Sequence, residues 1–223
     1  MKVKILVPES LSEITLEQYQ KFLKISKDNE DSLFLQQKMV EIFCSIDLKS
    51  VMNIKYNSIK KITTHLNNLF EQKPKFIETF IKDKKKFSFI PSLDDMSFGE
   101  FVDLDTTLTD WETMDKAMGV LFRPETQRHK HKYLIEKYET YDKYDMKEMP
   151  LGVALGAMVF FYNLGKALTL NMPTYLKEQM KKLTSQQKQD LTQNTDFITA
   201  YSVLVEEMLP SLMKSPSYQS INA

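Results

Sequence analysis

The chain of 223 residues has one cysteine, Cys44, so an intramolecular disulfide is excluded. It also lacks an apolar run of the roughly 18 residues that a membrane span requires, and it lacks a basic, apolar leader at its start. We therefore expect a protein that folds in a reducing compartment and has no membrane span. A hydrophobic content of 42% is sufficient for a sizeable core.

No charge of either sign predominates, because 30 basic residues balance 30 acidic ones. A broad positive field that attracts phosphate backbones is therefore not expected, which argues against specific nucleic-acid binding. Near-zero net charge removes long-range self-repulsion, so a multi-copy assembly is physically easy. Arginine is scarce, with only Arg123 and Arg128, and this bias matches an AT-rich coding sequence.

Motifs that carry catalysis are also missing, since no residue set has the spacing of a metal site, a nucleophile with its base, or a phosphate loop. His129 and His131 lie among cations that disfavour a divalent metal, so a basic surface patch is the simpler interpretation. Asp103 and Asp105 lie about 200° apart around a helix and cannot share a proton. We predict no enzyme and no catalytic, cofactor-binding or metal-binding residue.

What is present is helical periodicity with clear start signals. Thr15 and Gln18 form a capping-box pattern that opens a helix extending to about Ser26. Two more amphipathic helices are predicted, within residues 33–46 and 59–70. Ser97 and Glu100 form a second capping box, which predicts a helix from Phe98, and Asp110 can cap the next one, which Pro124 ends.

Two β-prone runs, residues 76–81 and 86–90, flank a lysine-rich tract, and this spacing indicates a hairpin with a loop of about four residues. The predicted fold class is therefore mainly α, a multi-helix globular domain with a small two-stranded β-hairpin. Residues 1–124 form the helical domain in this prediction, with the hairpin near 76–90.

Residues 125–148 combine many charges with tyrosines, and we interpret them as a connecting arm. Tyrosine supplies contact area at low entropic cost, so a surface stripe of them would favour an interface. The candidate interface residues here are Tyr133, Tyr138, Tyr141 and Tyr144.

Residues 149–210 are predicted to form C-terminal helices that pack on the same core, followed by a mobile tail at 211–223. Pro150 suits the first turn of a helix, and residues 151–164 contain no charge but are too short to span a bilayer. Gly152 and Gly156 lie four apart, which allows close approach of another helix. Tight packing within the fold is the simpler interpretation, and a dimerisation face is the alternative.

Three segments, taken together, resemble structural proteins of crAss-like tailed bacteriophages. They are FIPSLDDMSFGEFVDLD (89–105), DWETMDKAMGVLFRP (110–124) and MPLGVALGAMVFFYNLGKAL (149–168). The resemblance covers roughly residues 15–168 and weakens towards the C-terminus. The matching motifs are helix caps and packing residues. The resemblance therefore implies a family but assigns no active-site residue to this chain.

The resemblance implies a non-enzymatic virion component, either a packaged cargo protein inside the capsid or tail or a portal-neck-tail ring subunit. Its implied partners are other virion proteins, namely portal, ring, tail or capsid components. The implied location is the capsid interior or tail, and the bacterial host cytoplasm during assembly.

Two other functions remain open. A tail assembly chaperone would hold the tape-measure protein and stay out of the virion, and it needs an apolar groove, for which Met114, Met118 and residues 151–164 are candidates. A host-directed enzyme or effector would need Cys44 and His65 to meet in one pocket. Separately, each has a structural interpretation, Cys44 as a small buried hydrophobe and His65 as a satisfied helix residue.

Overall fold

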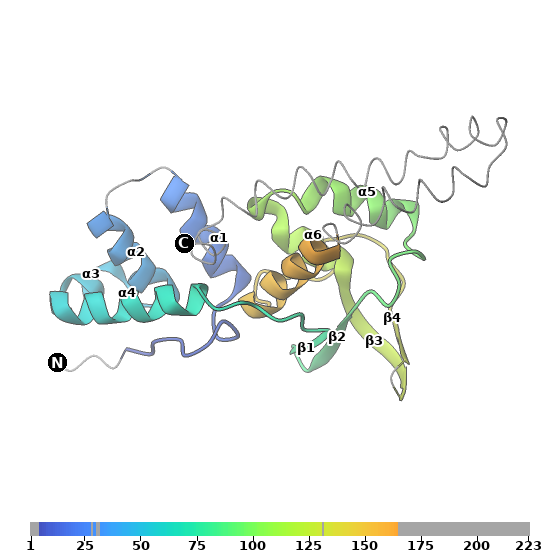
Figure 1. Ribbon diagram of the computed structural model, residues 1–223, viewed down its shortest axis with the longest axis horizontal. Coiled ribbons are helices and arrows are strands. Elements are labelled where there is room, and N and C mark those ends of the chain that lie inside the picture. The colour runs from blue at the N-terminus through green and yellow to red at the C-terminus, as the bar shows by residue number, and fades with distance from the viewer. Residues whose placement is uncertain (1–4, 28, 30–31, 131, 165–223) are drawn as a thin grey trace, which may run out of the picture.

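A computed structural model describes residues 5–27, 29, 32–130 and 132–164. The described chain has two regions (Figure 1). We call residues 5–70 the helical region and residues 79–144 the sheet region. A further helix begins at residue 151, continues through residue 164, and lies between the two regions in this view.

The helical region contains four α-helices, which are α1 (Leu16–Lys27), α2 (Ser32–Phe43), α3 (Leu48–Met52) and α4 (Tyr56–Phe70). The three longer ones confirm the helices predicted from periodicity. The capping box of α1 is also confirmed, because the Gln18 N–H donates to Thr15 Oγ1 at 3.2 Å and the Thr15 N–H donates to Gln18 Oε1 at 2.9 Å. The short α3 was not predicted, although Asp47 caps it by accepting the Ser50 N–H at 2.9 Å.

The predicted hairpin is present as β1 (Thr79–Lys82) and β2 (Lys85–Phe89). Its turn is shorter than the predicted loop of about four residues, because only Asp83 and Lys84 separate the strands. Both residues have positive φ, 50° and 62°. This backbone is that of a type I′ turn, whose twist matches the twist of the flanking strands.

Three helical elements connect β2 to the next strand, and they are α5 (Phe98–Thr107), the 3₁₀ helix η1 (Trp111–Thr113) and α6 (Met114–Leu121). The second capping box is confirmed at α5. Ser97 Oγ accepts the Glu100 N–H at 3.3 Å, and the Glu100 carboxylate accepts the Ser97 N–H at 2.7 Å. Asp110 caps η1 by accepting the Glu112 N–H at 3.0 Å.

The predicted fold class was wrong, because the protein is α+β rather than mainly α. Two further strands, β3 (Phe122–His129) and β4 (Lys132–Ile135), extend the hairpin into a four-stranded antiparallel sheet of order β1-β2-β3-β4. Pro124 was predicted to end the helix, and α6 does end before it, at Leu121. Pro124 itself was not predicted to lie in a strand, and it lies in β3 opposite Phe87. Its carbonyl, which proline retains, accepts the Glu136 N–H at 2.9 Å.

The segment 125–148, predicted as a connecting arm, contains most of β3 and all of β4. Of the predicted C-terminal helices, the structure describes only the part up to residue 164. Residues 165–210 and the predicted tail 211–223 lie outside the described residues.

The helix at 151–164 joins the two regions into one main hydrophobic core. On one side, the Leu151 N–H donates to the Ile14 carbonyl at 2.8 Å. On the other side, the Phe160 and Phe161 rings lie 5.4 and 6.2 Å from the Phe89 ring. The helix is thus a buried core element, as its lack of charge predicted.

Candidate interaction surface

The four tyrosines predicted as an interface are half-buried and attach the segment 125–148 to the rest of the fold. The Tyr133 hydroxyl donates to the Phe89 carbonyl at 2.8 Å. The Tyr138 hydroxyl donates to the Asp103 carboxylate on α5. These bonds use both hydroxyls within the chain.

The other two tyrosines lie further along the same segment. The Tyr144 hydroxyl donates to the Glu136 carboxylate. Tyr141 packs against the main core, and the Lys116 ammonium lies 5.4 Å from the centre of its ring. All four tyrosines therefore have structural partners, and their role as an interface stays a prediction.

A buried ion pair joins α5 to β3. Arg123 Nη2 lies 2.6 Å from Glu100 Oε1, and the two side chains are only 8% and 7% exposed. The Arg123 guanidinium also lies 5.5 Å from the centre of the Tyr138 ring. Its Nε has no hydrogen-bond partner among the described residues. The pair is therefore enclosed by protein, and its chemistry is that of a structural link between two elements.

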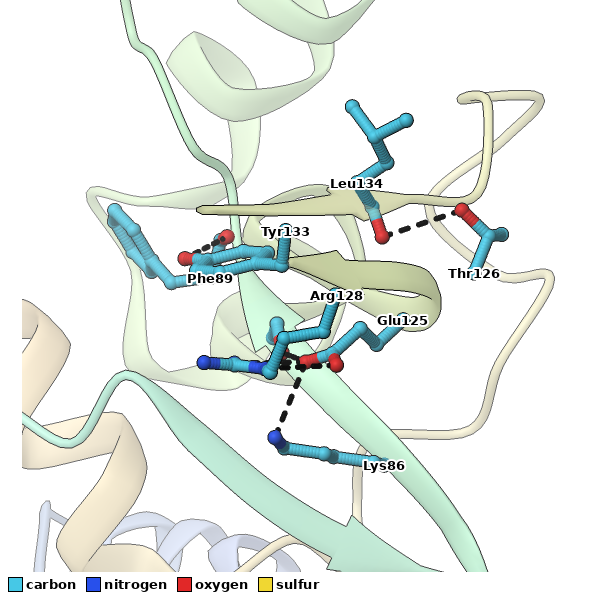
Figure 2. Close-up of polar contacts among 8 residues, drawn as sticks. Lys86, Phe89, Glu125, Thr126, Arg128, Tyr133 and Leu134 are labelled. Atoms are coloured by element: carbon cyan, nitrogen blue, oxygen red, sulfur yellow. Dashed lines mark hydrogen bonds and ion pairs between the residues drawn. The ribbon is translucent and has the colours of Figure 1, made fainter. Parts of the chain in front are cut away.

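A second charged cluster surrounds Glu125 on β3 (Figure 2). The Glu125 carboxylate accepts hydrogen bonds from Arg128 at 2.8 and 2.9 Å and from the Ser88 hydroxyl at 2.8 Å. Lys86 Nζ lies 3.3 Å from the same carboxylate. Hydrogen bonding, above all from Arg128, lowers the pKa of Glu125 to about 2. Glu125 therefore stays charged and fixes the position of two cations on the face of the sheet.

Glu136, just after β4, organises a third cluster. The Lys143 ammonium lies 3.4 Å from Glu136 and 2.7 Å from Glu139. The hydrogen bond from Tyr144, followed by the charge of Lys143, lowers the pKa of Glu136. These contacts hold the irregular chain after β4 against itself.

The two glycines predicted to allow close approach do so within the chain. A Cβ atom on Gly156 would lie 2.3 Å from the Lys75 carbonyl oxygen. A Cβ atom on Gly152 would lie 3.4 Å from Leu11 Cβ. The neighbours are therefore non-helical segments of the same chain, and the faces of these glycines are occupied.

The residues weighed for chemistry do not come together. Cys44 is buried in a small apolar cluster beside Val40, and burial raises the pKa of its thiol to about 11, so the thiol stays neutral. His65 Nε2 lies 2.8 Å from the Pro8 carbonyl, which gives the ring a backbone partner.

The residues that were weighed as metal ligands, for which no metal site was predicted, can be placed only in part. His129 is exposed at the end of β3, and His131 lies outside the described residues. Asp103 binds Tyr138, whereas Asp105 is exposed. Within the described ranges, no group of three or more His, Cys, Asp or Glu side chains could hold a metal ion. In the same part of the chain, no helix combines the length and apolar character needed to cross a bilayer.

Sequence reasoning missed both carboxylate–arginine clusters. A signal was present, because both arginines of the chain lie in the eight residues that became β3. Arginine suits buried or bidentate carboxylate pairs better than lysine does, because its planar guanidinium presents several donors. The scarcity of arginine was explained by coding bias alone, and the clustering of Arg123 and Arg128 was not considered.

No protein-family model, curated protein sequence or solved structure matches the chain.

Proposed function

We propose that this protein is a non-enzymatic virion component of a crAss-like tailed bacteriophage, acting as packaged cargo or as a portal-neck-tail ring subunit. The resemblance described above supplies the biological setting. Its three segments form α5, η1, α6 and the helix from residue 151 within the described chain. These elements supply much of the main core, so the resemblance rests on residues that specify a fold.

The proposal that the protein is not an enzyme is supported by the contacts of the carboxylates in the sheet region. Glu100, Glu125 and Glu136 each bind a cation or hydroxyl of the same chain. A catalytic carboxylate needs a free position for a substrate proton, whereas these are committed to holding elements together. The arrangement supports a scaffold that binds through its surface.

Exposed apolar side chains give such a scaffold places to contact other virion proteins. Phe98 is 83% exposed and Val102 40% exposed, one turn apart on α5. Leu48 and Met52 form a similar pair on α3. Side chains of this kind lower the free energy of association when a partner covers them.

The test is quantitative mass spectrometry of gradient-purified virions beside infected-cell lysate, normalised to the major capsid protein. Retention at many copies per particle is the expected result. A copy number that is a small ring multiple indicates a ring subunit, and a larger or irregular number indicates cargo. Abundance in lysate with absence from particles would overturn the proposal.

The tail assembly chaperone is the alternative that this last outcome would favour. Met114 and Met118, expected to line its groove, are buried at 1% and 0% exposure. A chaperone of this fold would therefore bind its client through other apolar side chains. Leu48 and Met52 on α3 are exposed, and methionine adapts readily to different partners.

A further inference from the structure

The two hairpin turns of the sheet project from the same end of the molecule. β2 and β3 are antiparallel, with Phe87 opposite Pro124 and Phe89 opposite Phe122. The turn that precedes β2 and the turn that follows β3 must therefore lie at one end of the sheet, as Figure 1 shows. The outer part of β3 pairs with β4, so this two-stranded ribbon extends past the residues that pair with β2.

This end of the sheet is strongly basic, although the whole chain is neutral. Residues 82–86 and 125–132 contain seven lysines and arginines against two carboxylates. Asp83 pairs with Lys82 at 2.8 Å, and Glu125 is shared by Lys86 and Arg128. The two carboxylates are thus already occupied by three of the cations.

Four exposed lysines remain, and we call them the basic sheet end. They are Lys84, Lys85, Lys130 and Lys132. None of them lies within ion-pair distance of a carboxylate of another described residue. Lys85 is the least isolated of the four, because its charge helps to lower the pKa of Glu136 and its ammonium lies 5.8 Å from the centre of the Tyr144 ring. Two come from each hairpin, so the register of the sheet gathers them at one place.

The backbone at the turns is unfavourable for lysine. Lys84 has φ of 62° and Lys130 has φ of 54°, in the left-handed region that favours glycine or asparagine. Glycine at these positions would adopt the same backbone without a Cβ penalty. The chain thus carries an exposed cation at both turns where a residue without charge would suit the fold better.

We propose that the basic sheet end binds the phosphate backbone of duplex DNA without reading its sequence. Unpaired, exposed lysines bind phosphates by releasing condensed counterions, a contribution that does not depend on base identity. A two-stranded ribbon fits the major groove of B-form DNA, whereas the major groove of A-form RNA is too narrow.

Single-stranded nucleic acid is a poorer match, because it is bound by exposed aromatic platforms. The nearby rings of Tyr133 and Tyr144 are half-buried, and their hydroxyls bond to Phe89 and Glu136. This binding is local and independent of sequence, so it is compatible with a neutral chain that has no broad positive field.

The test is fluorescence anisotropy of the full chain with labelled duplexes of unrelated sequence, titrated between about 50 and about 200 mM salt. The informative variant is Lys84→Gly with Lys130→Gly, which removes two cations and relieves both turns. We expect similar affinity for all duplexes and a linear fall of log K with log salt concentration. The double variant should lower the slope by about two, since each phosphate contact contributes about 0.9.

The melting temperature separates lost binding from lost folding. The glycine variant should melt at or above the temperature of the parent chain while binding DNA more weakly. The matched control is Lys49→Gln with Lys61→Gln, which removes two exposed lysines from α3 and α4 and should leave the salt slope unchanged.

Three outcomes would overturn the proposal. The first is no salt-dependent binding of duplex DNA at the lowest salt. The second is an equal loss of binding in the control variant, which would mean diffuse attraction rather than a defined surface. The third is binding of labelled poly-glutamate at least as tightly as DNA, which would assign the surface to an acidic protein.

Discussion

The helical region and the sheet region share one core, yet they bury different kinds of side chain. Among the described residues, Thr63 is the buried polar side chain of the helical region, and its hydroxyl donates to the Ile59 carbonyl one turn earlier. The sheet region buries four polar or charged side chains, which are Ser88, Glu100, Thr107 and Arg123. The helical region is therefore specified by apolar packing, whereas the sheet region also depends on each buried polar group keeping its partner.

The sheet region uses charged side chains both to join its elements and to present cations at its surface. Both the proposed virion role and the proposed binding of DNA depend on these charged side chains. Inside, Arg123 and Glu100 tie β3 to α5. At the surface, Glu125 positions cations beside the exposed lysines of the basic sheet end. A region that depends on paired charges can present the unpaired Lys84 and Lys130 at its turns without losing its fold, since both lie outside the Arg123–Glu100 pair and the Glu125 cluster.

The strongest test of this comparison is Arg123→Met. The change leaves the Glu100 carboxylate buried without its cation, and breaking a buried pair in this way costs about 3–5 kcal/mol. Chemical denaturation monitored by circular dichroism measures the loss of unfolding free energy. The matched control adds Glu100→Gln, which keeps the cap and removes the stranded charge, so the double variant should recover much of the stability. A cost below about 1 kcal/mol for Arg123→Met would contradict the dependence of the sheet region on charge.

In the helical region, the corresponding test is Leu66→Ala on α4. Leu66 is 0% exposed in the main core, so truncation removes hydrocarbon contacts and leaves a cavity. We expect a loss of about 3 kcal/mol in unfolding free energy. Leu66→Met, which roughly conserves volume, should cost less than about 1.5 kcal/mol. Equal losses for the two variants would argue that α4 packs loosely and would weaken the contrast between the regions.

The helix between the two regions can be tested with Gly156→Leu. The new side chain would collide with the Lys75 backbone, which cannot move aside as a flexible side chain could. Overpacking of this kind costs about 2–3 kcal/mol, and thermal melting should show it directly. Gly99→Ala on α5 is the control, because a Cβ there has no atom within 4 Å, and it should melt at or above the parent temperature. An unchanged melting curve for Gly156→Leu would remove this helix from its position in the core.

The helices were predictable because their signals are local. A capping box and a repeat of apolar residues lie within a few positions of one another, as at Thr15 to Gln18 and at Ser97 to Glu100. The first β-hairpin was predictable for the same reason, although its turn conformation was not. Position 84 has a positive φ, which glycine or asparagine would have indicated in the sequence but Lys84 does not.

The second half of the sheet was not predictable, because its determinants are far apart in the sequence. Pro124 locally favours the end of a helix, and only pairing with Phe87 on β2 makes it part of a strand. Tyr138 finds its partner, Asp103, on α5. The candidate site was missed for the same reason, since neither the Glu100 pair nor the Glu125 cluster is a sequence motif.

A smaller effect is expected from Ser97→Ala, which removes the side-chain cap of α5 but leaves Glu100 and Arg123 paired. The cost should be about 1 kcal/mol, because one backbone N–H at the helix start loses its acceptor. Ser97→Asp supplies another acceptor and should preserve stability. A loss for Ser97→Ala as large as that for Arg123→Met would mean that the cap, rather than the ion pair, fixes α5 on the sheet.

The size of the effect expected from Glu125→Gln depends on pH. The pKa of Glu125 falls from 4.5 to about 2 on folding, so the folded state favours the ionised carboxylate. The stability it contributes is fully present above about pH 4.5 and is lost as pH falls towards 2. The melting temperature of Glu125→Gln should therefore lie below that of the parent chain at neutral pH, and the difference should close on acidification.

Glu71→Gln provides the matched control for this titration in the helical region. Glu71 is exposed at the end of α4 and forms no ion pair with another described residue, so its replacement should shift the melting temperature little at any pH. If the melting temperature of Glu125→Gln still lay below that of the parent chain at pH 2, Glu125 would stabilise the fold through its shape rather than its charge. The exposed cations of β3 would then be held by the backbone alone, and the contrast between the two regions would be confined to the buried pair of Arg123 and Glu100.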